Sequence, residues 1–159
     1  MKNILILIVL TTSLLYSQQH QVGSTLLEER EVVNGLDVPW EIKWGPDSGM
    51  NSDGDGEDLS NFLWVTERPG IVSRINVETG EKYVILDIQS SVWDSNEAGL
   101  LGMEIHPEFN NGSPYVFLAY TYLSGGAKEK IVYYEYDNYL DELINEVVLL
   151  DGLDGNSTH

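Results

Sequence analysis

The chain has 159 residues, 42% hydrophobic and 10% aromatic, a composition typical of a folded protein rather than a disordered one. Its 26 acidic and 8 basic side chains give a net charge of −18, which argues against nucleic acid and anionic membranes as partners because phosphate binding requires clustered lysine and arginine. Cysteine is absent, which excludes a disulfide scaffold, a cysteine-linked lipoprotein and cysteine catalysis.

The first 18 residues have the pattern of a secretory signal peptide. Lys2 gives a charged start, residues 4–15 form a short apolar core, and Ser17 is a small residue suited to cleavage. The apolar run is too short for a convincing transmembrane helix. We therefore predict a signal peptide over residues 1–18, no integral membrane segment after its removal, and a periplasmic or secreted location. An uncleaved anchor is the alternative.

The next segments predict a first set of short strands. Leu26 to Val33 mixes apolar and charged residues and fits either an edge strand or a short helix. Strands are then expected at 41–45, 62–66, 71–76 and 84–87. Arg68-Pro69-Gly70-Ile71 predicts the turn between the second and third of them, because proline presets φ at the second position and glycine accepts a positive φ at the third.

An acidic loop at 47–58 interrupts this set. Asn51, Asp53, Asp55 and Gly56 match the start of an EF-hand calcium loop, but Phe62 stands at the twelfth position, where that motif requires glutamate. We interpret the loop as solvated rather than calcium-binding. A secreted, acidic, calcium-binding adhesive module is an alternative that depends on this loop alone.

A second set of β-rich runs repeats the first. It includes 115–120, which corresponds to 62–66, and runs at 131–134 and 148–151, with a helical turn expected at 141–145. Pro46 and Pro107 are 61 residues apart, and Asp87 and Asp151 are 64 apart.

Four short strands per unit are typical of one β-propeller blade, and propellers need roughly four to eight blades. We therefore predict an all-β fold of two four-stranded antiparallel blades, one at about 38–88 and one at about 99–151. On this interpretation residues 26–159 are the N-terminal part of an incomplete propeller, inactive alone.

Three phrases then resemble one enzyme family. They are VPWEI at 38–42, LWVTERPG at 63–70 and GLLGMEIHPEF at 99–109. Together they resemble the soluble sugar dehydrogenases that use pyrroloquinoline quinone, the glucose/sorbosone dehydrogenase family. The resemblance implies a six-bladed β-propeller, usually periplasmic, in which a sugar gives a hydride to the quinone, calcium polarises the quinone and a histidine is the general base.

The resemblance also implies two site residues. His159 occupies the start of the family motif that supplies the general base, although the family's usual acidic residue before it is Thr158 here. An imidazole that is neutral near pH 7 suits this task. Glu97 aligns with a loop position that faces cofactor and sugar, where some members carry glutamine. For both, a solvated loop residue is the alternative.

Two other features are interpreted as structural. His106 has no second histidine or cysteine at ligand spacing, so we expect it to fix a turn by a hydrogen bond rather than bind a metal. Glu67 and Arg68 are interpreted as a hairpin-end ion pair rather than as channel-lining groups. We predict no metal ligands in the chain, since the residues that hold quinone and calcium are expected downstream. The alternative function is a non-catalytic secreted propeller that binds protein or glycan.

Overall fold

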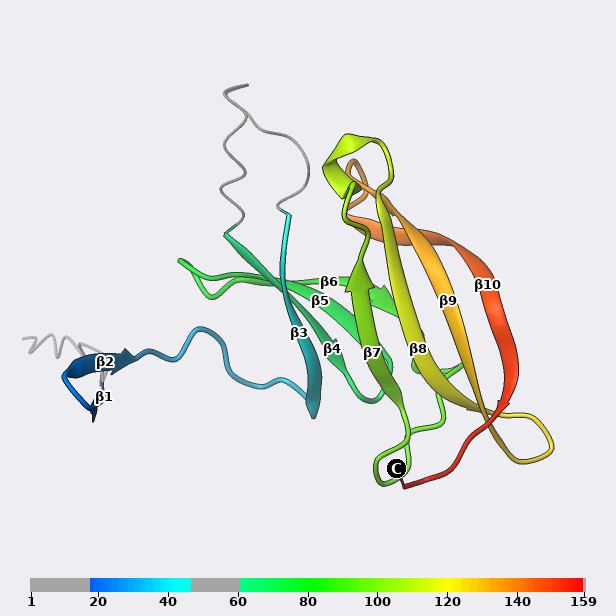
Figure 1. Cartoon of the computed structure of the whole chain (residues 1–159). Coiled ribbons are helices and arrows are strands. Elements are labelled where there is room, and N and C mark those ends of the chain that lie inside the picture. The colour runs from blue at the N-terminus through cyan, green and yellow to red at the C-terminus, as the bar shows by residue number, and fades with distance from the viewer. Residues whose placement is uncertain (1–17, 47–60, 159) are drawn as a thin grey trace, which may run out of the picture. The chain divides into compact units, whose positions relative to one another are not determined.

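The computed structural model describes residues 18–46 and 61–158, and this part of the chain is all-β (Figure 1). It contains one two-stranded and two four-stranded sheets, all antiparallel, and a short 3-10 turn, η1, at Phe109–Asn111. The all-β prediction is therefore confirmed. The chain divides after Glu31 into two units, which are described separately. Apart from Gln18, the predicted signal peptide lies outside the described residues, as do the acidic loop and its EF-hand-like sequence up to residue 60.

The first unit carries a hairpin of β1 (Gln18–Val22) and β2 (Thr25–Glu29). Gly23 opens its two-residue turn at φ 62°, a left-handed conformation that glycine adopts without steric cost. Of the two alternatives for 26–33, the strand is correct over 26–29 and the helix is wrong. The partner strand β1 was not predicted, because its residues fall at the polar end of the signal-like segment.

The second unit begins with a sheet in the order β3-β4-β5-β6. Its strands are β3 (Pro39–Gly45), β4 (Phe62–Glu67), β5 (Ile71–Asn76) and β6 (Lys82–Asp87), which confirms the predicted strands. The β4–β5 turn starts one residue earlier than predicted, since the Gly70 amide donates to the Glu67 carbonyl at 2.9 Å. Gly70 has φ 122°, and a Cβ there would lie 2.9 Å from the Gln89 backbone, so a side chain at this position would be strained.

The other four-stranded sheet has the order β10-β9-β8-β7. Its strands are β7 (Leu100–Ile105), β8 (Tyr115–Leu123), β9 (Ala127–Asp137) and β10 (Glu142–Asp154). β4 and β8 are each the second strand of a sheet, as the repeat predicts. The helical turn predicted at 141–145 is wrong. Asp141 and Asn145 adopt left-handed φ values of 55° and 57° instead, which Asp and Asn tolerate better than most residues.

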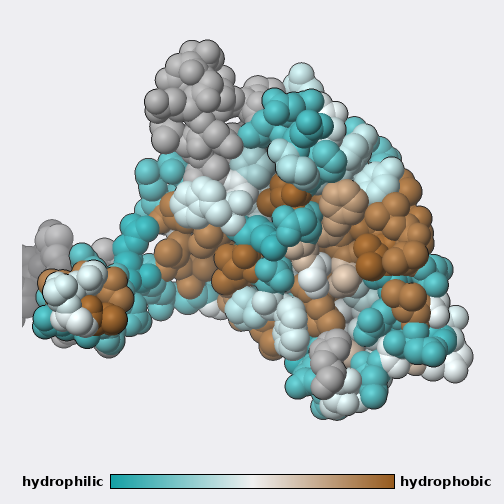
Figure 2. All heavy atoms as spheres, in the orientation of Figure 1, coloured by the Kyte–Doolittle hydropathy of each residue, from teal (hydrophilic) through white to brown (hydrophobic). Residues whose placement is uncertain are grey.

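Apolar side chains remain on the surface of both sheets. Figure 2 shows them gathered over β9 and β10, with a second group over β3. In β10 the exposed apolar residues are between 39% and 52% exposed: Val147, Val148, Leu149, Leu150 and Leu153. In β3 Ile42 and Trp44 are more than half exposed.

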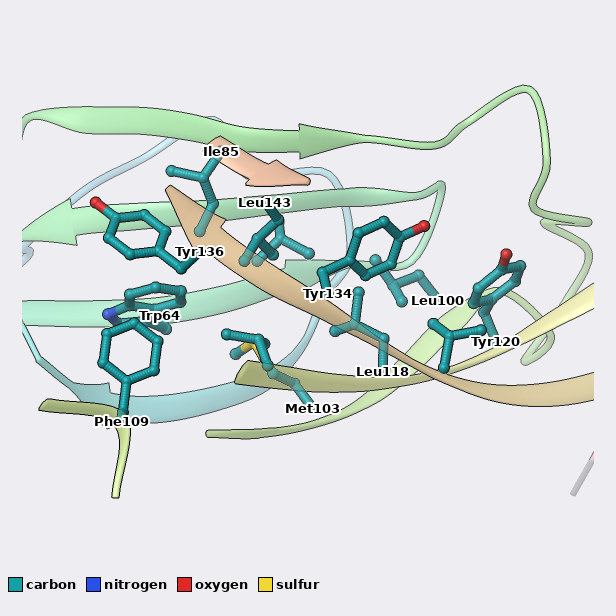
Figure 3. Close-up of a cluster of buried hydrophobic side chains, with 13 residues drawn as sticks. Trp64, Ile85, Leu100, Met103, Phe109, Leu118, Tyr120, Tyr134, Tyr136 and Leu143 are labelled. Atoms are coloured by element: carbon teal, nitrogen blue, oxygen red, sulfur yellow. The ribbon is translucent and has the colours of Figure 1, made fainter. Parts of the chain in front are cut away.

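The core lies between the two four-stranded sheets (Figure 3). β8 buries every second residue, Val116, Leu118 and Tyr120, because successive side chains of a strand point to opposite faces. From the other sheet Trp64 enters this core and meets the rings of Phe109 and Tyr136 edge-on, at centroid distances of 5.7 and 5.4 Å. In β8 the strand periodicity therefore determines which face is buried, whereas β4 and β5 bury consecutive residues on both faces.

Candidate functional site

The candidate site is built on the loop 88–99, which joins β6 to β7 at the end of the sheets where the β4–β5 turn lies (Figure 1). The Ile88 amide donates to the Gly70 carbonyl at 2.8 Å. Further along, the Trp93 amide donates to the Thr121 carbonyl at 2.8 Å, and the Thr121 amide donates to the Gly99 carbonyl at 2.9 Å. The loop is therefore fixed to β8 on both sides of residues 94–98.

Glu97 lies at the corner of a tight turn within this loop. The amide and carbonyl of Ser95 bond to the carbonyl and amide of Ala98, at 3.2 and 3.0 Å, and Asn96 adopts φ 55°. Ala98 is fully buried, whereas Glu97 is exposed. The turn thus buries its small residue and leaves the glutamate accessible from solvent.

The same loop contacts the segment that leads to the second predicted site residue. The Glu97 amide donates to the carbonyl of Ser157 at 3.0 Å, and the Gly155 amide donates to the carbonyl of Ala127 at 3.2 Å. The structure therefore joins Glu97 to a residue two positions before His159. His159 itself lies outside the described residues, so its place beside Glu97 stays a prediction.

Arg68 supports this loop, a role that the sequence did not indicate. Its Nε donates to Asp94 Oδ1 at 2.6 Å and its Nη1 donates to the carbonyl of Asn96. Its own carbonyl accepts the Leu100 amide at 2.8 Å. The sequence carries no signal for these contacts, because Arg68 belongs to the β4–β5 turn and Asp94 to the loop between the two sheets, and the two meet only in the folded chain.

Glu67 has a different role from its neighbour. It is 2% exposed, pairs with Lys82, and accepts the Asp37 amide at 2.6 Å and the Ser73 hydroxyl at 3.4 Å. It thereby fastens the segment before β3 onto the first sheet. The interpretation of Glu67 and Arg68 as one hairpin-end ion pair is therefore corrected: each binds a different partner.

His106 fixes a turn, as predicted. Its Nδ1 accepts the Glu108 amide at 3.1 Å, and its ring stacks on Phe117 at a centroid distance of 6.2 Å. Within residues 18–46 and 61–158, no group of three or more histidine or acidic side chains could hold a metal ion.

The charge around Glu97 does not by itself suit the carboxylates of a quinone. Asp94 and Glu97 are anionic, and the nearby cation Arg68 is already paired with Asp94. Around Glu97 the described residues thus form an exposed acid on a loop that Arg68 and Asp94 support. In the same part of the chain, no helix is long and apolar enough to cross a membrane.

Comparisons with known proteins point to one family. A family model described as Glucose / Sorbosone dehydrogenase matches residues 36–158. Among curated proteins, quinoprotein glucose dehydrogenase B of Acinetobacter calcoaceticus is 29% identical over 152 residues, which cover 90% of this chain and 29% of that protein. The chain therefore spans less than a third of the length of this relative.

Two solved structures are similar in fold. One is the PQQ-bound form of aldose sugar dehydrogenase from Streptomyces coelicolor, with a TM-score of 0.65 and 24% identity, covering 82% of this chain and 35% of that one. The other is a putative oxidoreductase (glucose dehydrogenase) from Thermus thermophilus, with a TM-score of 0.60 and 29% identity, covering 80% of this chain and 32% of that one.

Proposed function

The chain belongs to the glucose/sorbosone dehydrogenase family, and on this premise we propose that it is the N-terminal part of an exported, six-bladed β-propeller enzyme that oxidises an aldose or related sugar. Its two four-stranded sheets are the first two blades in this proposal. Export is supported by the signal-like sequence of residues 1–18, and N-terminal sequencing of the exported protein should begin near Ser17 or Gln18.

The observation that carries the proposal is the hydrogen bond between the Glu97 amide and the Ser157 carbonyl. It joins the loop that the family resemblance assigns to the sugar pocket with the segment that leads to the expected general base. Glu97 is exposed at its turn, so its carboxylate can orient a sugar hydroxyl through a charge-assisted hydrogen bond.

The proposed chemistry divides between chain and cofactor. His159 accepts the proton of the reacting hydroxyl as general base, for which it must lie within hydrogen-bond reach of that oxygen. Pyrroloquinoline quinone and calcium, when bound, supply the hydride acceptor. The proposal places most of the residues that hold both cofactors downstream in the longer protein.

The test uses the full-length protein, reconstituted with quinone and calcium and assayed with glucose. His159→Ala should lower kcat about 10²- to 10⁴-fold, the usual loss for a general base, and should still bind quinone. Glu97→Ala should raise KM more than it lowers kcat. Near-normal turnover of His159→Ala would contradict the assignment of the base. A wild-type protein that binds no quinone would instead favour a non-catalytic propeller that binds protein or glycan.

A further inference from the structure

We propose that Arg68 is a positioning residue, which holds the turn 95–98 and thereby fixes Glu97 in the site. This inference rests on the proposed function in so far as Glu97 contacts the sugar. It assigns Arg68 no contact with substrate or cofactor.

The contacts of Arg68 surround this turn. Its side chain binds Asp94 just before the turn and the carbonyl of Asn96 inside it, while its backbone carbonyl binds Leu100 just after it. Arg68 is itself fixed, because its amide donates to the Val38 carbonyl at 3.0 Å. One residue thus connects the first sheet to two points of the loop that carries Glu97 and to the first residue of β7.

The close approach of Gly99 supports the same role. A Cβ at Gly99 would lie 2.4 Å from Arg68 Cγ and 2.5 Å from the Arg68 carbonyl oxygen. Gly99 also has φ 156°, so a side chain there would be strained in addition to clashing. The loop backbone therefore lies directly against Arg68.

The guanidinium is the group that this geometry requires. Its rigid fork donates from Nε and Nη1 to two different acceptors at once, whereas a lysine ammonium on a flexible stem does not reproduce both directions. The Arg68 side chain is 22% exposed and Asp94 is 31% exposed, so solvent screens the pair only partly.

The first experiment measures amide hydrogen exchange in the full-length protein without quinone or sugar. Arg68→Ala should speed the exchange of the Glu97, Ala98 and Leu100 amides by roughly tenfold or more, the loss expected for a hydrogen bond to a charged group. The β8 and β9 amides should not change. The matched control is Glu104→Gln, which removes the acid partner of Lys43 at a 2.9 Å ion pair elsewhere. Unchanged exchange at 97–100 in Arg68→Ala would overturn the proposal.

The second experiment measures glucose oxidation by the reconstituted protein. Arg68→Ala should raise KM roughly ten- to hundredfold with a smaller change in kcat, and Arg68→Lys should restore little of it. The double variant Arg68→Ala/Glu97→Ala should have no higher KM than Glu97→Ala alone, because both changes act through one carboxylate. Additive effects would overturn the positioning role. If the wild type oxidises no aldose, the proposed function fails, while the exchange measurement still decides whether Arg68 holds the turn.

Discussion

Arg74 is a buried cation at the contact between the two four-stranded sheets. Its side chain is 5% exposed, its Nη2 lies 2.8 Å from Asp141 Oδ1, and its guanidinium lies over the Phe62 ring at 4.5 Å. The same Asp141 oxygen accepts the Tyr136 hydroxyl at 2.7 Å. Asp141 therefore neutralises a desolvated charge from the other sheet and fixes the β9–β10 turn at the same time.

We expect Asp141→Asn to destabilise the full-length protein by roughly 2 kcal/mol, because the buried Arg74 guanidinium loses its charged partner, which is itself 32% exposed. Asparagine tolerates the left-handed φ of this position, so the backbone is not the cause of the loss. Arg74→Met should cost less, since an apolar side chain of similar length removes the charge together with its desolvation. Urea denaturation of both variants measures their free energies of unfolding. If Arg74→Met loses more stability than Asp141→Asn, this expectation is wrong.

At this scale the sequence indicates candidate residues better than it indicates their partners. Glu97 and the structural role of His106 follow from motifs that are local in sequence. The partners of Arg68, Glu67 and Arg74 come from other loops or strands, 26, 15 and 67 residues away. Such pairs depend on how strands are placed side by side, which no local pattern specifies.

Strand β10 shows where element prediction succeeds and where it fails. Its apolar run 148–151 is correctly predicted as strand, because β-branched and aliphatic residues favour a pleated, half-buried surface. Its full extent, Glu142–Asp154, is not, since the pairing with β9 shifts between Ile144 and Val147 and twice more further along. Each shift inserts an unpaired residue that breaks the alternation on which strand prediction depends.

Two hydrogen-bonded carboxylates hold the far end of β10 to its neighbours. The Tyr122 hydroxyl donates to Asp151 at 2.5 Å and Lys128 pairs with Asp154 at 2.7 Å. The Tyr122 hydroxyl and the Gly152 amide lower the pKa of Asp151, and Lys128 lowers the pKa of Asp154, both from an ordinary value of 3.8. Because the folded state favours the ionised forms, their contribution to stability is present above the ordinary pKa and is lost as the pH falls through the lowered values.

The double variant Asp151→Asn/Asp154→Asn should therefore be less stable than wild type in the full-length protein near neutral pH. The difference should disappear in strong acid, where protonated aspartate resembles asparagine. Urea midpoints at about pH 7 and about pH 2 measure it, and the comparison cancels the effects of every other titrating group. A difference in urea midpoint between wild type and the double variant that is as large at about pH 2 as at about pH 7 would contradict this account.

For the second unit as a whole, the strand register determines which residues of the β7–β10 sheet lie on the face that points away from the core. Paired residues of an antiparallel ladder share a face, so Val147 lies with Tyr133 and Leu150 with Ile131, opposite to the buried Val132. Phe117 joins them through its pairing with Tyr133. This face is apolar and partly exposed, which is unusual for the surface of a complete monomer.

We expect a protein that comprises residues 18–159 alone to aggregate through this face and to lack cooperative thermal unfolding as a monomer. The proposed function supplies the reason, since a further blade would cover Tyr133 and Val147. Val147→Lys with Leu150→Lys should raise the soluble fraction of the 18–159 protein, because charge on an exposed apolar strand opposes association. In the full-length protein the same pair should destabilise, since two cations would be buried without partners. Light scattering measures the aggregation of the 18–159 protein, and urea denaturation measures the stability of the full-length protein. If the two lysines are favourable in both proteins, nothing covers this face.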